Sequence, residues 1–112
     1  MKRRQKFNAQ PTEIVHKGKV VKCASKFEAK KLHELILLLR AGEIRHLEFH
    51  PRYPLTVNGR KICDYVADAE FEEGPDGKLV VYEAKGSETP AWKIKRKLFE
   101  ALYAYELRVV KA

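Results

Sequence analysis

Two acidic residues and one lysine have the types and the spacing to do hydrolytic chemistry. Glu83 and Lys85 are separated by a single residue, so on a β-strand both side chains emerge on the same face. In a hairpin that is symmetric about Pro75 and Asp76, positions that sum to 151 lie opposite each other. Asp68 then faces Glu83 directly, and the amine of Lys85 lies beside the two carboxylates.

Two carboxylates in these positions require a positive partner. At about 5 Å and an effective dielectric of about 20, they repel each other by about 3 kcal/mol. Lys85 offsets part of this repulsion, and a hard divalent cation offsets more. Because Mg²⁺ favours one or two carboxylates together with water and phosphate oxygens, Asp68 and Glu83 predict a Mg²⁺ or Mn²⁺ site. The alternative is a cross-strand ion pair on the surface, worth about 0.2 to 1 kcal/mol.

A metal at this position favours hydrolysis of phosphodiester bonds. The cation would polarise the scissile phosphate and lower the pKa of a bound water. We expect Lys85 to orient that water or to stabilise negative charge in the transition state. Electrostatic help is favoured over general-base work, because nearby carboxylates stabilise the charged form of a lysine.

Two strands and a turn are expected to position these groups. From Ile62 to Phe71, apolar and polar residues alternate, which predicts a strand with one core face and one acidic face that carries Asp68. Residues 74–77, Gly-Pro-Asp-Gly, have the composition of a turn. Residues 79–85 form the returning strand, so the acids lie in a hairpin.

Two helices are expected to flank the strands. Ser25 is the N-cap of the first, over residues 25–41, where apolar residues recur at helical spacing. Gly42 supplies its left-handed exit. Thr89 as N-cap and proline at the next position start the second helix, over residues 90–104.

The second helix is strongly basic. Its apolar residues Ile94, Leu98 and Leu102 are expected to face inward. This leaves a basic outer face that predicts a track for DNA phosphates, formed by Lys93, Arg96 and Lys97, with Lys95 towards one flank. A solvated helix face is the alternative.

The remaining segments complete an α/β fold. Short strands are expected as a hairpin over residues 13–22, as an edge strand within 44–57 and as a last strand over 107–110. Pro51 and Pro54 limit regular pairing in the second of these. We expect a mixed central sheet of four to five strands with the two helices packed against it.

The composition favours a polyanionic partner. Lys and Arg total 23 against 15 Asp and Glu, which gives a net charge of +8 and a pI near 9.6. The length of 112 residues fits one domain over 12–112, preceded by a flexible basic arm over 1–11 or, alternatively, a frayed terminus. Without an apolar segment for secretion or membrane crossing, and with only two cysteines, we expect a cytoplasmic protein with reduced thiols.

The arrangement of these residues resembles that of the PD-(D/E)XK nuclease superfamily. The matching motif consists of Asp68, fourteen intervening residues, Glu83-Ala84-Lys85-Gly86 and the basic run over 93–98. More narrowly, about residues 13–110 are similar to small phage and prophage proteins related to phage junction-resolving endonucleases. Within that range, residues 25–28 and 41–44 match the family's first helix and its exit.

The resemblance implies a restriction-endonuclease-like fold and endonuclease activity on DNA with Mg²⁺ or Mn²⁺. It implies branched or junction DNA of phage recombination as the substrate. It also implies that Asp68, Glu83 and the carbonyl of Ala84 bind the metal, that Lys85 is the catalytic lysine, and that Glu28 adds an acid from the first helix. Ala67 stands where the motif's name has proline, a departure that changes no ligand, and Ala69 stands where relatives tend to carry an aromatic residue.

Glu28 and the histidines allow other interpretations. Ser25 and Glu28 have the spacing of a capping box, in which the glutamate accepts from a backbone N–H at the helix start. Capping and catalysis both stay open for Glu28. His46 and His50 lie in a stretch whose spacing suits neither a helical zinc motif nor a paired-cysteine site, so we do not expect it to bind metal.

We therefore predict a metal-dependent DNA endonuclease in the cytoplasm of a bacterial host. Cutting both strands of a duplex or a junction needs two active sites, which predicts a homodimer. A nucleic-acid-binding module without catalysis is the alternative from another class. A third interpretation is a basic interaction protein whose acids are only surface charge.

Overall fold

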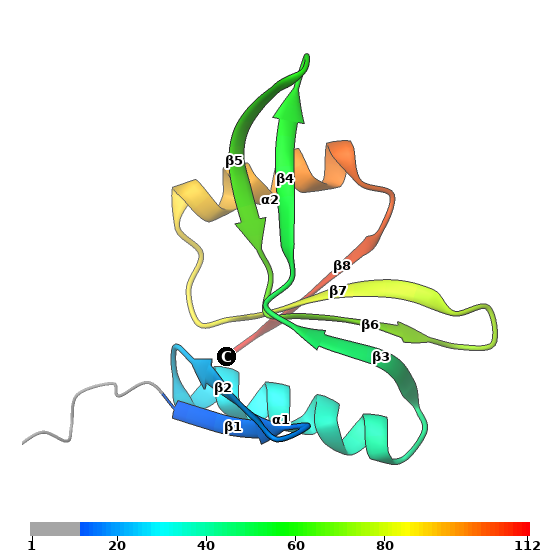
Figure 1. Cartoon of the computed structure of the whole chain (residues 1–112). Helices are drawn as coiled ribbons and strands as arrows, with labels where there is room; N and C mark the ends of the chain where they lie inside the picture. Colours follow the sequence, from blue (N-terminus) through cyan, green and yellow to red (C-terminus); the bar gives the residue numbers. More distant parts are fainter. Residues whose placement is uncertain (1–11) are drawn as a thin grey trace, which may run out of the picture.

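The computed structural model describes residues 12–112 of the chain (Figure 1). In chain order its elements are β1 (Thr12–His16), β2 (Lys19–Cys23), α1 (Lys26–Arg40), β3 (Ile44–Phe49), β4 (Arg52–Val57), β5 (Arg60–Val66), β6 (Ala69–Glu73), β7 (Lys78–Lys85), α2 (Pro90–Leu102) and β8 (Glu106–Lys111). The basic arm predicted over residues 1–11 lies outside this described part. Neither α1 nor α2 has the length and hydropathy that crossing a bilayer requires.

The strands form one sheet of four and two separate hairpins. The sheet has the order β3-β6-β7-β8, with β7 and β8 parallel and the other neighbours antiparallel. A parallel pair needs a long crossover, and the segment that contains α2 makes it. β1 pairs with β2, and β4 pairs with β5. The predicted α/β architecture with a mixed sheet of four to five strands is confirmed.

Strand β7 is buried on both faces. Val80, Tyr82 and Ala84 pack into a core with α1, whereas Val81 packs into a second core with Trp92 and Phe99 of α2. Figure 1 shows the same division, with α1 and the β1–β2 hairpin on one side of the sheet and α2 with the β4–β5 hairpin on the other. Residues 80–84 of β7 are therefore shielded from water on both sides.

Both helix starts and the end of α1 lie where the sequence predicted them. Ser25 caps α1, and its Oγ accepts from the backbone N–H of Glu28 at 3.1 Å. Thr89 caps α2 in the same way, through the backbone N–H of Trp92 at 3.1 Å. Gly42 has a φ of 79°, as the left-handed exit of α1 requires.

The inward face predicted for α2 is wrong at Ile94 and Leu102, and of the three predicted residues only Leu98 packs against a core. Ile94 is 61% exposed and Leu102 is also exposed, whereas Trp92 and Phe99 are buried and Leu98 is half-buried. The ring of Phe99 packs edge-on against two tyrosine rings of the β4–β5 hairpin at centroid distances of 5.1 and 5.4 Å. Aromatic rings bury more area than aliphatic chains, so they set which side of α2 meets the sheet.

The single strand predicted over residues 62–71 is divided into β5 and β6, which belong to different sheets. Ala67 and Asp68 form a corner between them. The backbone N–H of Ala67 donates to Pro51 at 3.1 Å, and that of Asp68 donates to Tyr82 at 3.1 Å. The predicted register, in which positions sum to 151, is confirmed from residue 69 opposite 82 to residue 73 opposite 78.

The stretch over residues 44–57 is divided in the same way. β3 ends at Phe49 and is an edge strand, as predicted, and β4 begins at Arg52. His50, with a φ of 54°, and Pro51 lie between them. The backbone N–H of His50 donates to the carbonyl of Asp68 at 3.0 Å, so the two chain corners are joined.

Candidate functional site

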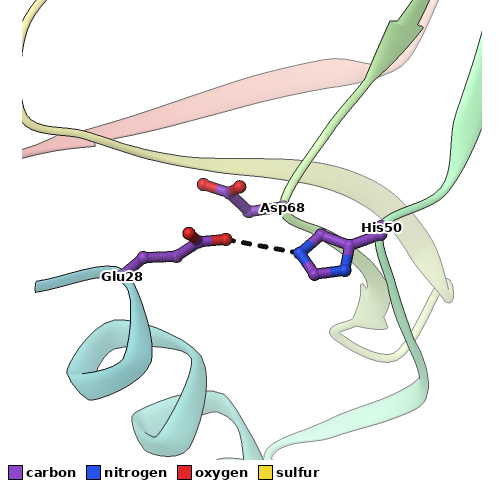
Figure 2. A group of neighbouring side chains, drawn as sticks. All are labelled: Glu28, His50 and Asp68. Carbon is purple, nitrogen blue, oxygen red and sulfur yellow. Dashed lines mark hydrogen bonds and ion pairs between the residues drawn. The ribbon is translucent and has the colours of Figure 1, made fainter. Parts of the chain in front are cut away.

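The side chains of Glu28, His50 and Asp68 meet where the two chain corners approach the start of α1 (Figure 2). Each residue contributes one nitrogen or oxygen atom, and these atoms all lie within 4.8 Å of one another. We refer to this group as the acid–histidine cluster. It combines one residue from a helix start with two residues from breaks between strands.

Glu28 has two structural roles, because its two oxygens have different partners. Oε1 accepts from the backbone N–H of Ala24 at 2.6 Å, just before the N-cap. Oε2 lies 3.3 Å from Nε2 of His50. The side chain is also only 8% exposed. Glu28 thus stabilises the helix start through Ala24 rather than through the N-cap residue itself, and it also belongs to the cluster. Its role in catalysis stays a prediction.

Asp68 is held in place by a backbone hydrogen bond, and its carboxyl group is crowded by other acids. Its Oδ2 accepts from the backbone N–H of Ala84 at 2.7 Å. Burial raises the pKa of Asp68 to about 8, with further contributions from the charge of Glu83 and from contact with Glu28. Buried like charges of this kind are relieved by a proton or by a cation.

Glu83 lies next to the cluster and is already engaged on both oxygens. The hydroxyl of Tyr65 donates to Oε1, and Nζ of Lys85 lies 3.4 Å from Oε2. Burial raises the pKa of Glu83, while Tyr65 and Lys85 act in the opposite direction. The side chain of Glu83 is only 6% exposed, so its charge acts on Asp68 through protein rather than through water.

Lys85 projects from the end of β7 between an acid and an aromatic ring. Its Nζ contacts Glu83 and lies 5.1 Å from the centre of the Trp92 ring. The side chain is 24% exposed. The amine is therefore fixed by its neighbours and still reachable from solvent.

The predicted residues are all in this region, but their grouping differs from the prediction. The sequence paired Asp68 with Glu83 across a hairpin, whereas the acid–histidine cluster joins Asp68 to Glu28 and His50. The reason is that β6 begins only after Asp68, whose backbone N–H donates to Tyr82, so the regular register that would place Asp68 opposite Glu83 ends before this residue. Ala84 contributes its N–H to Asp68, and its carbonyl as a metal ligand stays a prediction.

Sequence reasoning missed His50. It judged the histidine by its neighbours in the sequence, whereas its partner Glu28 is 22 residues away. The one local signal is that a proline follows this histidine at the end of a strand, where the chain must leave the sheet. His46 has no place in the cluster, because it is exposed and pairs with Glu72 at 3.1 Å.

The basic residues of α2 do not form one uniform face. Lys93 and Lys97 are exposed, whereas Lys95 and Arg96 are half-buried. The guanidinium of Arg96 lies 5.5 Å from the centre of the buried Trp92 ring, and its Nε is 3.4 Å from Glu100. The two exposed lysines are thus the members of this set that are free to meet a phosphate without rearrangement.

The donor atoms of the acid–histidine cluster suit a divalent cation. Carboxylate oxygens are the ligands of Mg²⁺ and Mn²⁺, and an imidazole nitrogen favours the transition metal. The two carboxylates also offset the charge of such an ion, while water and substrate can fill the remaining positions. Glu28, His50 and Asp68 are therefore the residues that could hold a metal here.

Comparison with known proteins places the chain in a sequence family. No curated protein matches the sequence. The family that matches is described as "Protein of unknown function (DUF1064)", and the match runs over residues 4–112. Because it covers the fold and all residues of the candidate site, the chain belongs to this DUF1064 family.

Proposed function

We propose that this protein is a metal-dependent endonuclease that hydrolyses phosphodiester bonds in DNA, with Mg²⁺ or Mn²⁺ as cofactor. The observation that carries the proposal is the convergence of Glu28, His50 and Asp68 beside Glu83 and Lys85. Buried acids around a reachable lysine are costly for stability. Such a group is expected where a cation and an anionic substrate meet.

Each residue has a distinct role in this proposal. Glu28, His50 and Asp68 hold the cation, which supplies Lewis acidity and a bound water of lowered pKa. Lys85 stabilises the negative charge that develops on the phosphate. Glu83 fixes the amine of Lys85 through its contact at 3.4 Å and adds to the negative potential that attracts the metal.

The substrate and assembly belong to the same proposal. The order of the central sheet, with Asp68 before β6 and Glu83 on the adjacent β7, supports a restriction-endonuclease-like fold. The resemblance to junction-resolving endonucleases supports branched or double-stranded DNA as the substrate, cut by a homodimer during phage recombination in the bacterial cytoplasm. The net charge of +8 favours the approach of DNA at low salt.

A nucleic-acid-binding module without catalysis is the second candidate. The observation that favours it is that both oxygens of Glu83 already have protein partners, Tyr65 and Lys85. A closed arrangement of this kind can serve stability alone. In that case the basic surface would bind DNA and the acids would take no part in cutting.

A cleavage assay separates the two candidates. Branched and linear DNA are incubated with the protein in Mg²⁺, in Mn²⁺ and in chelator. We expect cutting only with metal, and a loss of rate of about 100-fold or more in Asp68→Asn and in Lys85→Ala. Asparagine at position 68 can still accept from the N–H of Ala84, so the backbone contact is kept.

Asp64→Asn is the matched control, because Asp64 belongs to surface pairs with Arg52 and Lys61. We expect it to cut at the wild-type rate. Binding without metal-dependent cutting in the wild type would support the binding module. Equal cutting by Asp68→Asn and wild type would overturn the assignment of the site.

A further inference from the structure

A groove of about 380 Å³ lies between the β1–β2 hairpin and β3. Its hairpin side is lined by His16, Lys17, Lys19 and Lys22. Its other side includes Glu48 and Phe49 of β3 and His50, which follows that strand. We refer to it as the hairpin groove. Because His50 also belongs to the acid–histidine cluster, the groove borders the candidate metal site.

The hairpin groove is lined by three lysines and one carboxylate, that of Glu48, so the charge of its lining within the described residues is net positive. Lys17, Lys19 and Lys22 are all exposed, and none of them forms an ion pair with a carboxylate of residues 12–112. Lys78 and Lys111, in contrast, have carboxylate partners at 2.5 and 2.6 Å. Three lysines without a carboxylate partner among the lining residues form a suitable contact for a chain of phosphates.

His16 adds a second observation in the wall of the groove. Its ring packs edge-on against Phe49 at 5.2 Å. Its Nε2 is buried and has no hydrogen-bond partner within the described residues. Since buried polar atoms nearly always have a partner, this nitrogen is an unsatisfied polar position in the wall of the groove.

We propose that the hairpin groove binds the sugar-phosphate backbone of the DNA strand and leads it to the acid–histidine cluster. The inference rests on the proposed function, because it states where the DNA substrate of that site would bind on the protein surface. It also differs from the sequence prediction, which placed the phosphate track on α2. A concave groove fits a strand better than it fits a flat bilayer, so the observations favour DNA over an anionic membrane.

The test measures binding of fluorescent duplex DNA in chelator, where no cutting interferes. The variant K17Q/K19Q/K22Q removes three charges and keeps side chains of similar length. We expect its dissociation constant to rise about tenfold or more, and the slope of log affinity against log salt to fall by about 2 to 3. Circular dichroism checks that each variant is folded.

Two matched variants isolate the cause. R60Q/K61Q/K78Q removes the same number of charges at the turns of the other two hairpins, and we expect it to bind within about threefold of wild type. K17R/K19R/K22R keeps the charges, and we expect wild-type binding. Equal losses in the first control and the groove variant, or a full loss in the arginine variant, would overturn the inference.

The outcome can be distinguished from failure of the proposed function. If wild type binds DNA but does not cut it with metal, only the nuclease proposal fails, and loss of binding in the groove variant still supports the groove. If wild type cuts and the groove variant binds and cuts equally well, only the groove inference fails. Absence of DNA binding in wild type, or binding to phosphatidylserine vesicles in its place, overturns the inference.

Discussion

At the scale of single residues, the site depends on the different partners that the two oxygens of each carboxyl group bind. Glu28 divides its oxygens between a helix start and His50, and Glu83 divides its own between Tyr65 and Lys85. The pKa of Asp68 is raised by burial and further by its two acidic neighbours, Glu83 and Glu28. This makes Asp68 the residue whose carboxylate gains most from a bound cation.

The contribution of His50 to metal choice can be measured directly. His50→Asn is expected to weaken Mn²⁺ binding by about tenfold and to change Mg²⁺ binding less, because imidazole is a better ligand for Mn²⁺. Asparagine tolerates the positive φ of 54° at this position. Isothermal titration calorimetry of the metal-free protein with each ion gives the two affinities.

His46→Asn is the matched control for this measurement. His46 also has a positive φ, of 53°, but it lies outside the cluster and contacts Glu72. We expect unchanged affinity for both ions. If His50→Asn and His46→Asn behaved alike, His50 would not be a ligand.

At the scale of elements, breaks between strands matter more for the site than the strands themselves. The corner at Ala67 and Asp68 and the corner at His50 and Pro51 are joined by backbone hydrogen bonds of 3.0 and 3.1 Å. These bonds position the side chains that face Glu28 at the start of α1. A regular strand through residue 68 would have placed Asp68 directly opposite Glu83 of β7.

The orientation of α2 predicts unequal effects of two truncations. Phe99→Ala is expected to lower the free energy of unfolding by about 3 to 5 kcal/mol, because Phe99 is fully buried between aromatic rings. Ile94→Ala is expected to cost less than about 0.5 kcal/mol, because the side chain is 61% exposed. Urea unfolding measures both changes. A larger loss of stability for Ile94→Ala than for Phe99→Ala would show that α2 buries the face that the sequence predicted.

At the scale of the whole molecule, β7 holds two cores together, and one arginine links the strands on either side of it. Arg108 of β8 makes two hydrogen bonds, of 2.6 and 3.2 Å, to Glu73 of β6. It also contacts Glu106 at 2.9 Å. Arg108 holds the pKa of Glu73 below its ordinary value, and together with Lys78 it does the same for Glu106.

This link predicts a pH-dependent effect of Arg108→Met. Because both glutamates have a lowered pKa in the folded state, their stabilisation is present above the ordinary value of 4.5 and is lost as pH falls below it. The groups are about a third exposed, so we expect a cost of only about 1 kcal/mol at pH 7. The difference from wild type should shrink towards pH 3 in urea unfolding.

Arg52→Met provides the comparison, because Arg52 pairs with Asp64 at the surface and is 65% exposed. We expect it to change stability by less than about 0.5 kcal/mol. A cost for Arg108→Met that stays constant from pH 7 to pH 3 would mean that packing, and not charge, explains the effect.

The sequence by itself determined the local features of this protein. The caps at Ser25 and Thr89, the exit at Gly42 and the register between β6 and β7 all follow from residues that are close in the chain. So do the number of helices and the mixed character of the fold. These features depend on hydrogen bonds and on hydrophobic periodicity within a few residues of the chain. The sequence pattern therefore predicts them directly.

Only the tertiary structure decided which of these residues meet. It divided the strand over 62–71, placed His50 beside Glu28, and turned Phe99 rather than Ile94 towards the sheet. Each of these outcomes depends on packing between segments that are far apart in the chain. There, alternative apolar faces and alternative backbone partners compete for the same contacts. A local pattern contains no information about that competition, so the grouping of the site residues had to come from the fold.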